Sequence, residues 1–532
     1  MTAKVEFKLM NTRSQRNQKL NPVSPVAHVI DRTSHSPSTG VLLWWAVWLF
    51  WKSPGARWLM VAFTIMIGIA SVCGYQTYQK RADTIEALEK RAVWNRTIQR
   101  AAVQGVDSPE DVFGKTLTPE ETGRARIQKM IAPLPTSLAY TGGNFLATLN
   151  PSPMMILSAG VSDLWSDRFN VTAHSQLKNL QREEIANSYQ LEVGTWDVTM
   201  IVVYFLPLII LAFTYNFIPF DREQGILRLI LSNSIECRRW TVINLFVRIF
   251  IPVMIVLPVS ILPVIEAWGS EQFQTVLVNA AVWGLAVILY GLFWMSSSLL
   301  VNSLGGSSLQ NGITLSLFWV ILVVLIPHGV ARTARSLHPV ARHHDLIIQE
   351  RAFRASAEAN QSEIKEAYYR EHPQITMPTK KEDPYNQTRW DAIRLKVDSR
   401  MHPLIRGAQT QMQKRIEWCR LGTIFSPSVA FQSVQEDLAG TSLAHHSQFV
   451  LRASEYDEEF KEFFQPRMMS REQLTLADYE IMPTFQYQNI AWNQDLTLII
   501  FSLFSLSIWT CSLFVIGFRR LRTEIALGVR GD

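Results

Sequence analysis

The sequence predicts an all-α membrane protein with six transmembrane helices, an N-terminal interfacial helix and a mainly helical lobe outside the membrane. Two observations support this prediction. The chain of 532 residues is 48% hydrophobic and only 18% charged, below the roughly 25% charge of typical soluble domains. Its apolar residues form blocks of about 20 residues, the length of a membrane-spanning helix, and long polar stretches separate these blocks.

The N-terminal part contains a polar tail and then two apolar segments of different length. Residues 1–40 are polar and basic, and they predict a disordered cytosolic tail because no apolar core of a signal peptide follows the start. Residues 41–51, VLLWWAVWLFW, are rich in Trp and too short to span, so we expect a helix in the membrane interface. The break KSPGAR separates this helix from the first span, and both lie within 41–78.

Two long polar regions, 79–195 and 329–494, are predicted to lie outside the cytoplasm and to pack against each other as one lobe. Helix-like patterns open the first region and recur at 345–371 and 390–420 in the second. The two regions contain one cysteine, Cys419, so no intramolecular disulfide can join them. We therefore expect the lobe to depend on an apolar core of its own.

The remaining apolar blocks give the other five spans. Residues 196–328 contain the second to fifth spans, with a charged loop at 218–241 between the second and the third. Three prolines in the third span predict kinks whose freed carbonyls need partners on neighbouring helices. The sixth span covers 495–518, and a short basic cytosolic tail, 519–532, follows.

Charge sets the predicted orientation. The short segments that flank the spans on one side carry an excess of Lys and Arg, whereas each of the two long polar regions carries as many Asp and Glu as Lys and Arg. By the positive-inside rule both termini are cytosolic in a multi-pass protein of the cytoplasmic (inner) membrane. The basic pI of about 9.1 then reflects topology, and we expect no nucleic-acid partner.

Charged residues gather where the chain leaves the second span, in FDREQGILRLILSNSIECRRW. A short surface helix that docks into a cytosolic partner would account for this pattern, and an ordinary polar loop with basic anchors is the alternative. The candidate site residues are Asp221, Arg222, Glu223, Gly225, Leu227, Arg238 and Arg239.

This stretch resembles the coupling loop of type-2 (exporter-like) ABC transporter permeases, and the six-span layout is similar to theirs. Two further stretches, ILSAGVSDLW at 156–165 and FSPSVAFQSVQEDLAGTSLAHHSQF at 425–449, resemble an uncharacterised subgroup with two large extracytoplasmic insertions. The chain departs from the family at Ile243-Asn244, where Gly-Lys is common. A lysine that faces a partner is therefore not expected there.

The resemblance implies the permease subunit of an ATP-driven ABC transporter. A separate cytosolic ATPase would bind the loop around 221–239, and a second permease subunit, identical or a sister, would complete the assembly in membrane lipid. The chain lacks GxxxxGK[ST], HExxH and GxSxG sequences, so we expect neither enzymatic activity nor a cofactor. The alternative is a non-conducting subunit that transmits ATPase motion to extracytoplasmic partners.

Histidine pairs and intramembrane charges suggest little further chemistry. Adjacent histidines, as in His343-His344 and His445-His446, point in different directions, so we expect hydrogen bonding or helix capping and no metal site. Charge within the spans is scarce, which disfavours proton-coupled transport. Asn244, Asn279 and Asn302 are expected to join helices by hydrogen bonds.

Overall fold

The computed structural model describes most of the chain, and the described residues are 38–106, 112–114, 116–160, 162, 164–179, 196–225, 237–267, 273–383, 385–487 and 492–528. Nearly all regular structure within them is helical, and the strands there form one antiparallel pair, β1 (Leu146–Thr148) with β2 (Arg168–Asn170). The predicted disordered tail lies almost wholly outside these residues.

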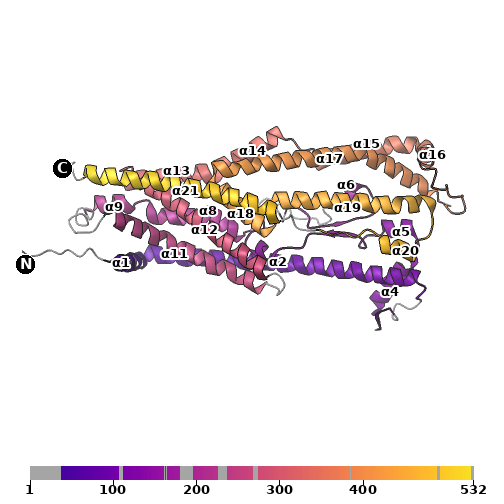
Figure 1. The fold of residues 1–532 in the computed structure, drawn as a ribbon, viewed down its shortest axis with the longest axis horizontal. Helices are drawn as coiled ribbons and strands as arrows, with labels where there is room; N and C mark the ends of the chain where they lie inside the picture. Colours follow the sequence, from indigo (N-terminus) through magenta and orange to yellow (C-terminus); the bar gives the residue numbers. More distant parts are fainter. Residues whose placement is uncertain are drawn as a thin grey trace, which may run out of the picture.

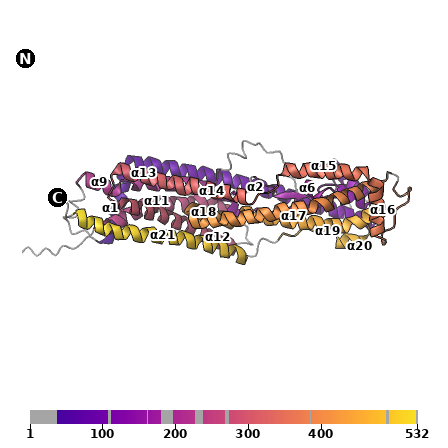
Figure 2. The same ribbon diagram turned by 90° about the horizontal axis from the view of Figure 1, so that it is seen from above.

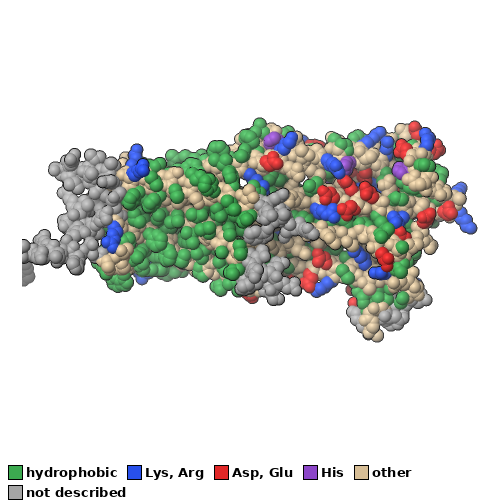
Figure 3. Space-filling view, in the orientation of Figure 1, with side chains coloured by type: hydrophobic (Ala, Val, Ile, Leu, Met, Phe, Trp, Pro, Cys, Tyr) green, Lys and Arg blue, Asp and Glu red, His purple; other side chains and the backbone are tan. Residues whose placement is uncertain are grey.

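The molecule is long, with an apolar half and a charged half (Figure 1, Figure 3). Among the described residues, six helices are long and apolar enough to cross a membrane, so the predicted all-α membrane fold is confirmed. In both ribbon views the first and the last of them lie on opposite sides of the bundle (Figure 2). The helices are α2 (Pro54–Val103), α8 (Val198–Thr214), α11 (Cys237–Glu266), α12 (Phe273–Asn302), α13 (Ser308–Trp319) with its continuations, and α21 (Trp492–Gly528).

Large aromatic side chains fill the interior of the bundle. Trp283, Tyr290 and Trp294 on α12 are all fully buried, and α12 contacts α8, α11 and α21. Outward-facing apolar side chains such as Ile69 and Phe504 are more than half exposed in the isolated chain. They belong to the broad apolar surface of this half (Figure 3), which is suited to contact lipid.

The predicted interfacial helix is present as α1 (Thr39–Lys52), separated from α2 at Ser53. Leu42 and Ala46 of α1 pack against α11, whereas Trp44 is 64% exposed. The helix that contains the first span extends beyond residue 78. Instead α2 continues to Val103, so one helix of about 75 Å joins the apolar half to the lobe.

The two insertions form one lobe, as predicted. Phe145 of the first insertion lies 4.9 Å from Phe460 and 5.4 Å from Phe464 of the second, between ring centroids. Lys461 pairs with Asp398 and Asp457 beside this core. The lobe helices are α4 (Pro119–Ile131), α5 (Pro135–Tyr140), α6 (Gln176–Asn179), α15 (His343–Ala359), α16 (Gln361–Glu371), α17 (Gln387–Phe425), α19 (Leu443–Ser470) and α20 (Leu476–Ile481).

Part of the second insertion enters the apolar half, which differs from the prediction that all of 329–494 lies outside. The end of α17 and the following helix α18 (Pro427–Ala439) form a hairpin between the spans, here called the re-entrant hairpin. Trp509, in the middle of the sixth span, donates to the carbonyl of Ile424 at 2.8 Å. The apolar stretch here is too short for a span, so its depth was not evident from the sequence.

Candidate functional site

The predicted coupling loop begins with a short helix, α9 (Phe217–Glu223), at the end of the molecule opposite the lobe (Figure 1). The Arg222 guanidinium donates to the carbonyls of Gly305 and Gly306 at 3.0 and 2.7 Å. The Glu223 carboxylate accepts from the backbone N–H and the hydroxyl of Ser308, both at 3.1 Å. These two residues therefore connect α9 to the start of the fifth span.

The other predicted site residues are only partly brought together. Asp221 is half-buried on α9, and Gly225 ends the described loop with a φ of +72°, a left-handed conformation that glycine adopts without strain. Arg239 donates to the hydroxyl of Thr39 on α1. Leu227 and the predicted surface helix lie outside the described residues, as does the side chain of Arg238.

Asn302 joins three elements at the same end, which confirms the helix-to-helix role expected of it. Its amide donates to the Thr214 carbonyl at 2.9 Å, and its side-chain oxygen accepts from Asn311 at 3.3 Å. The same oxygen accepts from the backbone N–H of Ile218 at 3.4 Å. The second, fourth and fifth spans are thereby connected directly beneath α9. The Asn244 amide, by contrast, donates to the Trp240 carbonyl of its own helix, α11, at 3.0 Å.

A second cluster lies where the apolar half meets the lobe, and the two family-like stretches meet there. The Thr441 hydroxyl, from the second stretch, donates to the Ser158 carbonyl of the first at 3.0 Å. Asp197 and Thr199, at the start of the second span, bond the backbone of Ala159 and Leu157 at 2.9 and 3.0 Å. Three distant parts of the chain thus fix one loop.

This loop contains a 3₁₀ turn, η1 (Pro153–Ile156), that closes the lobe-facing end of the bundle. Residues Met154–Leu157, here called the plug, are all buried, and Met154, Ile156 and Leu157 belong to the same apolar core as the spans. The plug contacts α2, α11, α12 and α18. A Cβ added at Gly74 would lie 2.2 Å from the Ile156 carbonyl oxygen, so only glycine allows α2 to approach this closely.

The re-entrant hairpin is hydrogen-bonded to the fifth span at an irregular point. After α13 this span continues as a π-helix, η3 (Val320–Leu325), and then as α14 (Ile326–Leu337). In a π-helix the Leu322 carbonyl would accept from residue 327, which is Pro327 and has no N–H. The hydroxyls of Ser426 and Ser428 donate to that carbonyl instead, at 2.7 and 2.9 Å.

The adjacent histidines of the second stretch have different surroundings. His445 is hydrogen-bonded through Nδ1 to the Ser442 hydroxyl at 2.8 Å, which confirms the hydrogen-bonding role expected there. His446 lies 5.1 Å from Trp165, between ring centroids, and burial lowers its pKa to about 4. Within the described residues no group of three or more His, Cys, Asp or Glu side chains could hold a metal ion.

Sequence reasoning missed the plug and the bond from the hairpin to the fifth span. Prolines and serines in both segments were visible, but they suggested loops because no pattern indicates which distant backbone they contact. The only hint in the sequence was the pair of stretches at 156–165 and 425–449 that resemble a family pattern. Their meeting at Thr441 and Ser158 gives a physical reason for both motifs.

Comparison with known proteins gives one match. Residues 344–488 match a domain of unknown function, DUF3526. No curated protein and no solved structure matches the chain. The matched segment starts in α15, includes the re-entrant hairpin and α19, and ends after α20.

Proposed function

We propose that this chain is the permease subunit of an ATP-driven ABC transporter. It works in the cytoplasmic membrane with both termini cytosolic, together with a separate cytosolic ATPase and a second permease subunit. The observation that carries this proposal is the attachment of α9 to the fifth span through Arg222 and Glu223. A partner that pushes on α9 would move the start of that span directly.

The structure offers a continuous route for such motion. From Ser308 the fifth span runs through η3 to Leu322, whose carbonyl is bonded to Ser426 and Ser428. These serines lie at the start of α18, and α18 leads to Thr441 and the plug. Displacement at the α9 end can therefore reach the plug through hydrogen-bonded elements.

A second candidate is a non-conducting subunit that transmits ATPase motion to partners outside the cytoplasm. It is favoured by the filled interior of the bundle, where Trp283, Tyr290 and Trp294 occupy the space between spans. It is also favoured by the direct bonds from the fifth span to the re-entrant hairpin, which continues into the lobe through α17 and α19. A polar passage between two copies would support the transporter instead.

Crosslinking from α9 tests for the ATPase partner. The exposed residue Gln224, next to α9, is changed to Cys in a variant without the native cysteines, and intact membranes are treated with a thiol-to-amine crosslinker. We expect a covalent adduct with a protein that a photoreactive ATP analogue also labels. The matched control is Glu358→Cys on the exposed lobe surface. An ATP-labelled adduct from Glu358→Cys, or none from Gln224→Cys, would contradict the proposal.

A second experiment tests coupling once that ATPase is purified with the permease. Glu223→Ala removes the carboxylate that accepts from Ser308, and we expect the permease to lose most of its stimulation of ATP hydrolysis. Glu120→Ala changes an exposed carboxylate in the lobe and serves as control. Equal stimulation by both variants would separate α9 from coupling.

A further inference from the structure

Four buried side chains near the plug have polar atoms without a hydrogen-bond partner among the described residues. These atoms are the hydroxyls of Ser71 on α2, Ser158 directly after the plug and Ser260 on α11, and both amide atoms of Gln435 on α18. Each side chain is at most 2% exposed. Ser297, a buried serine of α12, by contrast donates to a carbonyl of its own helix at 2.9 Å. Buried polar groups are nearly always paired, so this set needs an explanation.

The unpaired groups belong to elements that contact the plug. Ser71 lies one turn before Gly74, the residue that lets α2 approach Ile156 closely. Ser260 and Gln435 lie on α11 and α18, and both helices contact the plug. Three helices around the plug, and the segment that follows it, therefore each carry a polar group that this conformation leaves unpaired.

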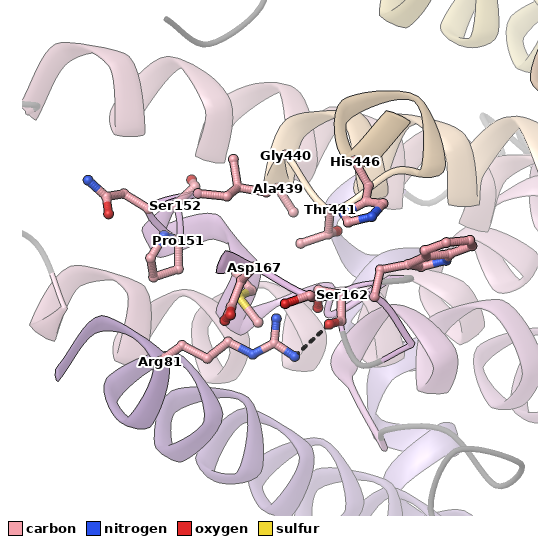
Figure 4. A pocket seen from close by; sticks show the side chains of 14 residues that line it. Arg81, Pro151, Ser152, Ser162, Asp167, Ala439, Gly440, Thr441 and His446 are labelled. Carbon is pink, nitrogen blue, oxygen red and sulfur yellow. Dashed lines mark hydrogen bonds between the residues drawn. The ribbon is translucent and has the colours of Figure 1, made fainter. Parts of the chain in front are cut away.

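The plug separates the core of the spans from a small pocket on its lobe side (Figure 4). Met154, Ile156 and Leu157 belong to the apolar core of the spans, whereas Met155 lines the pocket. The pocket has a volume of about 50 Å³, and one water needs roughly 10–15 Å³ by the same measure. The 3₁₀ turn of the plug therefore stands between a space that can hold water and the core.

Hydrogen bonds join the plug to α8, α12 and α18, and these four elements are here called the plug group. Thr199 of α8 donates to the Leu157 carbonyl of the plug at 3.0 Å. Tyr290 of α12 donates to the Val203 carbonyl of α8, also at 3.0 Å. The bond from Thr441 to the loop after the plug adds α18. Elements that are bonded to one another in this way are expected to move together.

The helices α2 and α11 pack on each other and meet the plug group through close apolar contacts. They lie along the lower side of the apolar half in Figure 1. A Cβ added at Gly291 of α12 would lie 2.9 Å from the side chain of Val253 on α11, and Gly74 of α2 is similarly close to the plug. A polar bond joins the two parts at the other end, where Arg248 of α11 donates to the Phe213 carbonyl near the end of α8. The boundary is therefore tight and apolar beside the plug and polar at its far end.

We propose that the bundle has a second, open conformation in which α2 and α11 tilt away from the plug group, with Arg248 as the pivot. Water then enters beside the plug and hydrates the four unpaired side chains. Their polar atoms gain partners that the closed conformation does not offer, so they lower the free energy of the open conformation relative to the closed one. This opening does not rest on the transport proposal, because it needs neither an ATPase nor a second subunit.

Cysteine modification tests the opening in the full chain, placed in lipid nanodiscs with its native cysteines replaced by alanine. A charged, water-soluble methanethiosulfonate reagent modifies thiolates in water and does not enter a closed apolar core. We expect mass spectrometry to show slow modification of Ser71→Cys and Ser260→Cys, because an irreversible reaction accumulates from a minor open state. The matched control is Ser297→Cys, equally buried but within the plug group, which should react about tenfold more slowly or less.

The comparison with the control decides the result. Modification of Ser71→Cys and Ser260→Cys no faster than that of Ser297→Cys would overturn the proposal. Thermal unfolding shows whether each variant is folded, and the two positions lie on different helices, so either one gives the result if the other fails to fold.

A further variant tests whether the unpaired groups favour opening. Gln435→Leu has a similar volume and removes two unpaired amide atoms from the closed conformation, so it should slow the modification of Ser71→Cys about tenfold. The matched control is Gln432→Leu, which changes an exposed glutamine of the same helix. An unchanged rate in Gln435→Leu, or equal slowing by Gln432→Leu, would refute hydration of the amide on opening. Crosslinking from Gln224→Cys tests the ATPase partner separately, so either proposal can fail without the other.

Discussion

The Leu322 carbonyl allows a quantitative test of how the fifth span is joined to the re-entrant hairpin. It accepts two hydroxyls, from Ser426 at 2.7 Å and from Ser428 at 2.9 Å, and these hydroxyls lie 2.8 Å from each other. Replacing either serine with alanine leaves the other to satisfy the carbonyl. Replacing both leaves a buried carbonyl without a partner, since Pro327 offers no N–H.

The expected free energies of unfolding follow from these contacts. Ser428→Ala removes one hydrogen bond worth about 1 kcal/mol. Ser426→Ala removes a similar bond and the N-cap of α18, for about 2 kcal/mol. The double variant should lose an additional 1–2 kcal/mol or so, because an unpaired buried carbonyl costs about 1–3 kcal/mol. The two serines should therefore be coupled more strongly than independent sites.

Equilibrium unfolding in mixed detergent micelles would measure this coupling. The matched control pair is Ser428→Ala with Ser505→Ala, because Ser505 bonds a different carbonyl, that of Thr423, at 2.8 Å. We expect the control pair to be additive within about 0.5 kcal/mol. Additivity of Ser426→Ala and Ser428→Ala as well would show that Leu322 does not need either hydroxyl.

Three other predictions concern the plug and the lobe. Gly74→Ala should lower stability by about 1–3 kcal/mol through its clash with Ile156, whereas Gly68→Ala, with open space around it, should be neutral or stabilising in the same thermal assay. Lys461→Met should cost about 3–5 kcal/mol in denaturant unfolding, because buried Asp457 loses its counter-charge; a loss under 1 kcal/mol would contradict this. The pKa of His446 is lowered from 6.5 to about 4, so the unfolded chain binds more protons in that window and stability should fall as the pH drops through it. His446→Gln should remove this part of the pH dependence, and an unchanged pH profile of unfolding would show that the imidazole is not buried in solution.

The spans could be predicted because their signal is local. Each apolar block is long enough to be recognised as a membrane span from composition. The polar and proline residues around Ser53 likewise indicate the break between α1 and α2. A helix was expected just after residue 78, but its continuity with the span was not evident, since no residue there shows whether the two helical patterns are joined without a turn. The re-entrant hairpin was missed because its depth depends on partners such as Trp509, far away in sequence.

The residues of the candidate site could be predicted from the sequence, but their contacts could not. The charge cluster at Arg222 and Glu223 was visible, but its contacts were not, because Gly305, Gly306 and Ser308 lie in a stretch without charge or motif. The small pocket on the lobe side of the plug (Figure 4) is lined by residues from four separate segments, among them Arg81, Pro151, Ser162 and Thr441. These segments are far apart in the sequence, so no local pattern indicates that they meet.

The length of α2 has a mechanical consequence. An unbroken helix of about 75 Å is a lever whose first half packs among the spans and whose second half carries part of the lobe. A tilt of about 5° at its base would displace its far end by roughly 6 Å, given the rise of 1.5 Å per residue. A small rearrangement among the spans would thus produce a larger displacement at the far end of the lobe.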